Sequence, residues 1–315
     1  MLKKVQRYCW CGCNTAHFVF KVNTCRGEAF NLVQCDDCYV YCIFPAPDDA
    51  TLLSYYDSEY YGASSLKFAG PVARAVAVFQ RERSKRVART VVQGGRVLDI
   101  GCGNGGFIKE MKKRGYDVEG TELTEASASR VSKEANILIH IGDPLSLELS
   151  ERSYDAVTLW HVIEHVRNPL ELLRKVNFLL KDTGVLFLSL PNHNSWQAKA
   201  FGKAWFHLDP PRHLFGFGIM SLIRLLGNCG FSVESANTFS LEYNPYGCMQ
   251  SVLNRVGFPR DRAYGTLKLS NAIPPLSKIT DLLLLGVLSL PAFAFELLAS
   301  CYDAGATMNV IARKR

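Results

Sequence analysis

The sequence predicts an α/β protein with a doubly wound, mostly parallel sheet, a small cysteine-rich N-terminal lobe and a late apolar helical segment. Between residues 96 and 239, short β-branched runs alternate with amphipathic stretches, which is typical of βαβ units. Seven of the 11 cysteines precede residue 43, and an uncharged apolar run follows residue 281. These three observations give the expected architecture.

The composition is that of an ordinary globular protein. Of 315 residues, 48% are hydrophobic and 21% charged, which excludes a disordered chain, a collagen and a small disulfide scaffold. The formal net charge of +7 permits an anionic substrate or membrane surface but demands neither. The opening MLKKVQRYCW contains no apolar run of a secretory signal, so we expect a cytoplasmic protein whose clustered cysteines bind metal.

Changes in amino-acid composition and pattern along the chain predict four parts. These are a cysteine-rich lobe at 1–62, a core at 63–240, an apolar helical insertion at 241–306 and a final strand at 307–315. Apolar runs and helical periodicity then give the elements. Strands are expected at 96–100, 117–121, 137–141, 154–159, 185–190, 231–239 and 307–313, and helices at 71–92, 104–115, 125–135, 169–180 and 217–227.

A glycine-rich loop follows the first strand of the core. Residues 97–107 read VLDIGCGNGGF, in which Asp99 precedes three glycines spaced two apart. Such glycines let the backbone approach a ligand, and Glu122, 21 residues after Gly101, can hold the hydroxyls of a ribose. A nicotinamide dehydrogenase would carry G-x-G-x-x-G instead, and Asp99 suits a cationic cofactor better than a pyrophosphate.

These motifs resemble those of class I S-adenosylmethionine-dependent methyltransferases. The likeness rests on VLDIGCGNGGF, on GTEL at 120–123 and on the run from GDPL to LPN at 142–192. A closer likeness, over nearly the whole chain, is to a bacterial-type subfamily with an N-terminal zinc-ribbon-like lobe, paired tyrosines and a DPPRHL segment, here at 209–214. The resemblance implies a seven-stranded Rossmann-like methyltransferase sheet and S-adenosylmethionine as cofactor.

The resemblance also implies which residues bind that cofactor. Asp99 and the glycines would line its methionine side, Glu122 would bind ribose, Leu123 would pack on adenine and Asp143 would lie near the adenine amino group. The candidate cofactor-binding residues are Asp99, Gly101, Gly103, Asn104, Gly105, Glu122, Leu123, Asp143 and Trp160.

The segment WHVIEH follows the fourth strand, at the edge where doubly wound sheets bind ligands. His161 is the first candidate for a general base, because histidine titrates in the right range to take a proton from an acceptor. Glu164 and His165 follow at i+3 and i+4, near one helical face. Three interpretations stay open: His161 is a base, the trio binds a metal, or Glu164 and His165 only hold the loop.

The N-terminal cysteines have the spacing of a structural zinc site. Cys35-x-x-Cys38 is an ordinary half-site, and Cys9 with Cys11 is the matching half of the subfamily pattern, one residue short. We expect one zinc ion on these four cysteines. Cys13 or Cys25 could take the place of one of these ligands. The alternative is a lobe that binds no metal.

The sequence marks the residues that would contact the methyl acceptor less clearly than those that would bind the cofactor. Tyr60 and Tyr61 could touch the cofactor or acceptor, or merely pack. The excursion at 191–215 would build the acceptor pocket, with His207, Arg212 and His213 as its polar tips. An arginine there suits a carboxylate or phosphate.

The apolar insertion holds 14 uncharged residues between Asp281 and Glu296, including Pro291. A membrane span needs about 20. We expect either a helix packed on the protein or a peripheral membrane contact through 279–300, with a true span as the third reading.

The expected function is methylation, at oxygen or carbon, of a small or lipid-linked acceptor such as a surface-polysaccharide sugar or a quinone-like lipid. There are two alternatives. One is an RNA methyltransferase guided by the zinc lobe and by the helix expected at 71–92, which is rich in arginine and lysine. The other is an inactive scaffold that binds the cofactor. We expect a cytoplasmic enzyme, with peripheral contact to the inner membrane face and no nucleic-acid partner.

Overall fold

The computed structural model of the chain describes residues 9–24, 26–55, 70–259, 262–268 and 273–315. Tyr60 and Tyr61 lie outside these residues. The chain divides into two compact units. The sheet unit is Tyr56–Leu190, Ile223–Ala236 and Val310–Arg315, and the cysteine unit is Met1–Tyr55, Pro191–Leu222 and Asn237–Asn309. The four-part division expected from the sequence stays a prediction.

A seven-stranded sheet organises the sheet unit, in the order β10-β11-β8-β7-β4-β5-β6. The strands are β4 (Arg96–Ile100), β5 (Asp117–Glu122), β6 (Leu138–Ile141), β7 (Tyr154–Trp160), β8 (Leu180–Pro191), β10 (Phe231–Asn237) and β11 (Thr307–Lys314). β4 pairs in parallel with both β5 and β7, and β6 and β8 extend the parallel sheet. The chain order therefore reverses between β4 and β7, which is where open sheets of this kind bind ligands.

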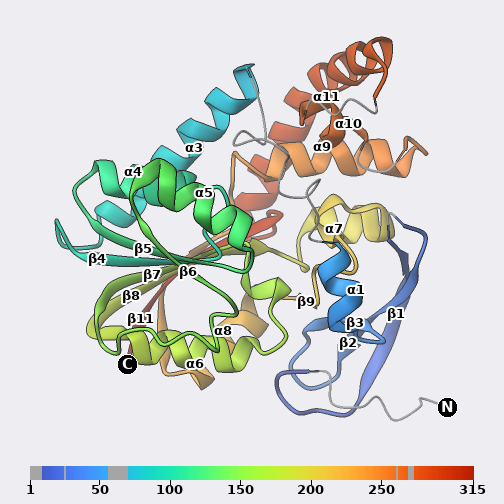
Figure 1. The fold of residues 1–315 in the computed structure, drawn as a ribbon. Helices are drawn as coiled ribbons and strands as arrows, with labels where there is room; N and C mark the ends of the chain where they lie inside the picture. The colour runs from blue at the N-terminus through green and yellow to red at the C-terminus, as the bar shows by residue number, and fades with distance from the viewer. Residues whose placement is uncertain (1–8, 25, 56–69, 260–261, 269–272) are drawn as a thin grey trace. The chain divides into compact units, whose positions relative to one another are not determined.

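Helices cover both faces of this sheet, which confirms the predicted fold class. Figure 1 shows α4 and α5 on one face and α6 on the other. The helices that belong wholly or partly to this unit are α3 (Gly70–Ala88), α4 (Gly106–Lys113), α5 (Glu125–Ala135), α6 (Pro169–Leu179) and α8 (Ile219–Asn228). The core between α4, α5 and the strands contains Ile108, Met111, Val131 and Phe187, all nearly inaccessible to solvent.

Several boundaries differ by a few residues from the sequence prediction, and the reason can be identified for two of them. The helix expected from residue 104 begins at Gly106, because Gly105 has a left-handed backbone (φ 70°) and still belongs to the loop. The strand expected from residue 185 begins at Leu180, which pairs with Tyr154. The register then shifts before Val185. The residues between Leu180 and Val185 are mostly polar, so the apolar pattern of the sequence did not indicate the earlier start of the strand.

A four-stranded sheet, β1-β2-β3-β9, forms one part of the cysteine unit. Its strands are β1 (Ala16–Asn23), β2 (Ala29–Cys35), β3 (Tyr41–Phe44) and β9 (Phe215–Gly216), all antiparallel to their neighbours. Trp205 and Leu208 pack with Val22, Leu32 and Ile43 in its core. The excursion after β8 therefore completes the N-terminal lobe, with both a strand and core side chains.

Helices form the rest of the cysteine unit. They are α1 (Asp49–Ser54), α7 (Trp196–Phe201), α9 (Asn244–Arg255), α10 (Arg262–Leu267) and α11 (Pro275–Cys301). The predicted apolar helical segment is thus present, and α11 packs on α9 and α10 around Leu253, Ala263 and Leu285. Among the described residues, α11 is the one helix long and apolar enough to cross a membrane.

Candidate functional site

The glycine loop lies at the carboxyl end of β4, and each of its three glycines has a positive φ. A Cβ at Gly101 would lie 2.8 Å from a methyl of Val162, and one at Gly105 would lie 2.4 Å from a methyl of Val131. A Cβ at Gly103 would meet no atom within 4 Å. Gly101 and Gly105 therefore serve close packing inside the protein, whereas Gly103 faces open space that a ligand can enter.

Glu122, at the end of β5, is held over this loop by two backbone groups. The N–H of Gly103 donates to its Oε2 at 2.9 Å, and the N–H of Leu123 donates to its Oε1 at 2.8 Å. A carboxylate has about four acceptor sites, so the same group can also accept hydrogen bonds from both hydroxyls of a ribose. The residues present thus fit the nucleoside part of S-adenosylmethionine.

Asp99 is buried in β4, and Thr158 of β7 donates a hydrogen bond to its Oδ1 at 2.6 Å. Burial raises the pKa of Asp99 to about 7, against the lowering effect of the Thr158 hydrogen bond. A nearby cation would favour the ionised carboxylate. The site is therefore better suited to a positively charged ligand than to a phosphate.

Three further candidates lie in the loop or shortly after β5 and β6. Leu123 is 52% exposed although it is apolar, as a residue that packs against a ligand would be. Asp143 is exposed, and its Oδ1 accepts a hydrogen bond from the N–H of Leu145 at 2.9 Å. Asn104 accepts a hydrogen bond from Arg130 at 3.1 Å and so helps to join the loop to α5.

The structure also adds Arg83, a residue of the helix expected at 71–92. Arg83 of α3 places its guanidinium carbon 5.2 Å from the ring centre of Trp160, which packs edge-on against Phe107. Its charge lowers the pKa of both Asp99 and His161. No motif marks this arginine, because its separation from the loop along the chain hides their proximity.

His161 directly follows β7 and has a left-handed backbone with φ 55°. Its N–H donates to the carbonyl of Ser189 at 2.7 Å, and its Nδ1 lies 3.4 Å from Oε1 of the buried Glu164. Burial, with a smaller effect of Arg83, lowers the pKa of His161 to about 3. The imidazole is therefore neutral at physiological pH, and burial makes it a weaker base than an exposed histidine.

The expected helical turn at WHVIEH is a 3-10 helix, Ile163–His165, with His161 outside it. His161 and Glu164 still approach each other, because the positive φ of His161 redirects the chain. A non-glycine residue in this conformation is strained, and such strain often marks functional sites. The roles predicted for His161, Glu164 and His165 stay predictions.

The acceptor candidates on the excursion after β8 are firmly held within the cysteine unit. Arg212 donates to both carboxylate oxygens of Asp209, at 2.9 and 2.6 Å. His213 donates through Nδ1 to the carbonyl of His207 at 2.8 Å, and His207 is buried. The charge of Arg212 is thus already balanced by Asp209, which weakens the expectation that it binds an anionic acceptor.

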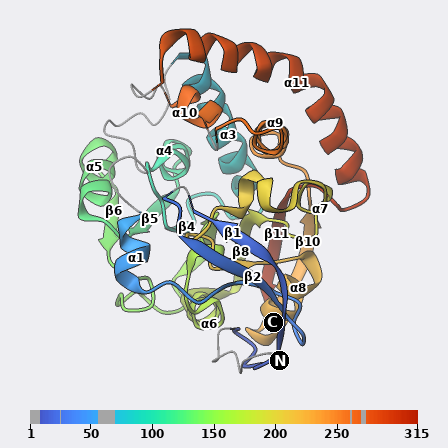
Figure 2. The same ribbon diagram turned by 90° about the vertical axis from the view of Figure 1, so that its right-hand side faces the viewer.

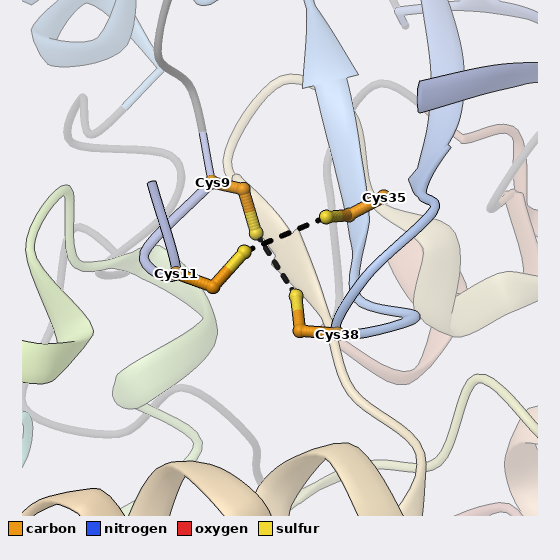
Figure 3. Close-up of side chains that lie close together, drawn as sticks. All are labelled: Cys9, Cys11, Cys35 and Cys38. Carbon is orange, nitrogen blue, oxygen red and sulfur yellow. Dashed lines mark hydrogen bonds between the residues drawn. The ribbon is translucent and has the colours of Figure 1, made fainter. Parts of the chain in front are cut away.

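Four cysteines gather at one end of the N-terminal sheet (Figure 3). The Sγ atoms of Cys9, Cys11, Cys35 and Cys38 all lie within 4.8 Å of one another. Cys9 and Cys38 are 3.1 Å apart, and Cys11 and Cys35 are 3.6 Å apart. Tetrahedral zinc with bonds of about 2.3 Å separates its sulfur ligands by about 3.8 Å, so this set fits zinc.

Cys13 lies apart from this cluster, with its Sγ 3.5 Å from the carbonyl oxygen of Thr15. Cys25 lies outside the described residues. Burial raises the pKa of the Cys11 and Cys35 thiols, and the hydrogen bond with Cys9 raises that of Cys38. Crowded thiols of this kind resist ionisation unless a cation joins them.

Comparison with known proteins agrees with this geometry. The family described as methyltransferase domain matches residues 72–236, just over half of the chain. A ubiquinone biosynthesis O-methyltransferase of Ralstonia nicotianae is 30% identical over 165 residues, covering 48% of this chain and 68% of that protein. A protein of the same name from Pseudomonas aeruginosa is 32% identical over 112 residues, covering 34% of this chain and 48% of that protein. The chain thus spans about half the length of some curated relatives it matches.

Two solved structures share the fold. One, from Galdieria sulphuraria, is a candidate sarcosine dimethylglycine methyltransferase, with a TM-score of 0.55 and 17% identity over 84% of this chain and 98% of that one. The other, a SAM-dependent methyltransferase from Archaeoglobus fulgidus, has a TM-score of 0.50 and 18% identity over 85% of this chain and 100% of that one.

The reversed strand order, the glycine loop and the acid at the end of β5 define a class I S-adenosylmethionine-dependent methyltransferase. The chain belongs to the methyltransferase domain family.

The three glycines should respond differently to a methyl group. Gly105→Ala should lower the free energy of unfolding by about 2–4 kcal/mol, because it combines a strained positive φ with overlap against Val131. Gly103→Ala adds only the backbone strain, and we expect a loss of about 1–2 kcal/mol. Urea unfolding of both variants measures the difference. Equal losses would contradict the distinction between a packing glycine and a ligand-facing one.

Proposed function

We propose that this enzyme transfers a methyl group to a hydroxyl of a neutral, quinone-like small molecule. The similarity to ubiquinone biosynthesis O-methyltransferases, 30% identity over 165 residues, carries the proposal. A lipid-linked sugar and transfer to carbon are the rival assignments.

The same proposal assigns the cofactor residues. S-adenosylmethionine supplies a methyl group activated by a sulfonium charge. Glu122 holds the ribose hydroxyls, and Asp99 balances positive charge. Leu123 and Asp143 contact the adenine, and Arg83 pairs with the cofactor carboxylate beside Trp160.

The affinity for the cofactor should depend on pH through Asp99. With a pKa of about 7, its carboxyl is mostly protonated at pH 6 and mostly ionised at pH 8. The preference for S-adenosylmethionine over S-adenosylhomocysteine, which lacks the sulfonium charge, should therefore grow by up to about tenfold between these pH values. Calorimetry with both ligands measures the ratio of the two affinities. Because the ligands share their amino and carboxylate groups, the titration of these groups affects both affinities alike and leaves the ratio unchanged.

Asp99→Asn should abolish this pH dependence, and Glu122→Gln should weaken both ligands equally at every pH. A wild-type ratio that does not change with pH would contradict the role of Asp99. If well-folded wild type bound neither ligand, the protein would instead be an inactive scaffold.

For the reaction itself, the proposal gives His161 the role of general base. The support is geometric: the imidazole lies at the switch point of the sheet and has Oε1 of Glu164 3.4 Å from its Nδ1, where a carboxylate opposes the loss of basicity that burial causes. A carboxylate there can orient the ring and stabilise it once protonated. Removing the hydroxyl proton while the acceptor is held in line with the methyl group is the main work left to the protein.

Turnover should depend on His161 and respond to the acceptor. Purified enzyme with S-adenosylmethionine is offered catechols and hydroquinones with prenyl tails, lipid-linked sugars, and RNA. We expect methylation of the first class.

His161→Gln should lower kcat by about 10²–10⁴-fold with little change in cofactor affinity. His17→Gln, at an exposed histidine of β1, is the matched control.

Unchanged turnover in His161→Gln would remove the proposed base while leaving the enzyme. Methylated RNA as the only product would overturn the small-molecule assignment in favour of the nucleic-acid alternative.

We also propose that Cys9, Cys11, Cys35 and Cys38 hold one structural zinc ion. Support comes from the convergence of their sulfur atoms within 4.8 Å. Four thiolates leave no open coordination position, so the ion would stabilise the lobe without taking part in methyl transfer. The cytoplasmic location and the absence of a nucleic-acid partner stay predictions alongside it.

Metal analysis of protein produced in zinc-supplemented medium should find about one zinc per chain. Cys38→Ser should lose the metal and lower the melting temperature, because metal binding contributes directly to folding. Cys13→Ser should keep it, since Cys13 lies outside the cluster. Zinc-free wild type, or equal zinc content in the two variants, would refute the site.

A further inference from the structure

The outer face of α11 is apolar along its whole length. Leu283, Val287 and Leu290 are 67%, 75% and 77% exposed, and Leu276, Ile279 and Leu298 extend the same face toward its ends. Only 22% of the most apolar 18-residue window of this helix is buried, so α11 is not a core helix. Figure 2 shows α11 as a long curved helix outside α9 and α10.

The two acidic residues of α11 point the other way. Asp281 is fully buried, where Arg262 donates to both its oxygens and Thr266 donates to Oδ2 at 2.6 Å. Glu296 is also fully buried and accepts hydrogen bonds from the Gln197 side chain at 2.7 Å and the Ala306 N–H at 3.3 Å. The polar groups of this helix therefore face the protein, and its apolar groups face outward.

This inverted polarity argues against a membrane span. Asp281 and Glu296 are 15 residues apart, about 22 Å along a helix, so a spanning α11 would carry both carboxyl groups into the hydrocarbon. It would also have to give up the buried partners of both acids. After α11, the N–H of Trp196 binds the carbonyl of Ala304 and the chain continues into β11.

The charged residues of the elements around α11 indicate the surface that covers its apolar face. Within the described part of segment 244–303, Asp281 and Glu296 are fully buried and Asp303 is exposed, whereas the basic Arg255, Lys268 and Lys278 are partly or fully exposed. At the C-terminal end of α11, Tyr302 stacks on Trp196 with ring centres 5.6 Å apart. An apolar helix face with basic neighbours and terminal aromatic rings is typical of helices that lie in the interface of an anionic bilayer.

We propose that α11 docks this enzyme on an anionic lipid bilayer, lying in the interface with the face of Leu283, Val287 and Leu290 inserted. The proposal rests on α11 and its neighbours alone and not on the acceptor. A bilayer satisfies the apolar face and attracts the basic groups at once, whereas a second copy of this chain would bring the same basic groups together.

The test is sedimentation of the full-length protein with vesicles. We expect binding to mixed phosphatidylglycerol and phosphatidylcholine vesicles and much weaker binding to phosphatidylcholine alone. The double variant Leu283→Asp/Leu290→Asp should reduce the partition coefficient by about tenfold or more, because it places charge in the inserted face. Met220→Asp, at a 70% exposed apolar residue of α8, is the matched control and should bind as wild type does.

A second variant, Lys278→Glu, should remove most of the preference for phosphatidylglycerol while keeping the residual binding to neutral vesicles. Retained S-adenosylhomocysteine affinity shows that the sheet unit of each variant is folded, and an unchanged helix content shows the same of the cysteine unit. A failure of vesicle binding is therefore distinct from a failure of the methyltransferase assignment. No vesicle binding by wild type would overturn the proposal. So would a lipid-free dimer that Leu283→Asp/Leu290→Asp dissociates, or wild type that stays in the vesicles after an alkaline wash.

Discussion

The hydrogen bond from the Gly103 N–H to the Glu122 carboxylate joins the ends of two neighbouring parallel strands, and the cofactor site depends on it. The bond requires β4 and β5 to end at the same level, which their parallel register provides by pairing Ile100 with Thr121. It also requires a backbone that can turn with positive φ beside a carboxylate, which glycine does without strain. The carboxylate proposed to bind the ribose is thus held in place by the protein itself, so little ordering would have to accompany binding.

The excursion after β8 has a comparable role in the cysteine unit. Trp205 packs in the core of the N-terminal sheet and donates through Nε1 to Gln197 at 3.2 Å. Gln197 in turn donates to Glu296 of α11. Burial raises the pKa of Glu296 to about 7, and the hydrogen bond from Gln197 lowers it in part. One chain of buried contacts therefore links the cysteine lobe to the apolar helix. The candidate acceptor residues His207, Arg212 and His213 belong to the same excursion, so they are presented by a packed segment and their geometry is set by the lobe.

The sequence predicts the sheet unit well because each of its signals is local. Strand and helix periods, the glycine spacing and Glu122 can all be recognised within a few residues, and the structure confirms the fold they imply. Two other features depend on contacts distant along the chain. Arg83 lies beside Trp160 only because α3 folds back on the sheet, and Trp205 completes a lobe that begins about 180 residues earlier. The cluster of four cysteines was predictable from spacing, but Cys13 could be set apart only by its position in space.

The apolar insertion shows why composition alone misdirects a membrane assignment. Counting uncharged residues between Asp281 and Glu296 treats the two acids as ends of the apolar segment, yet α11 continues past both of them from Pro275 to Cys301. Each acid is instead a contact point by which the helix is fastened to its own protein. Fastening at two places about four turns apart fixes the rotation of the helix about its axis, and so determines which side chains remain outside. The exposed face is therefore set by these two attachments together with the apolar packing of Leu285, Ala292 and Ala299 on the same side of the helix.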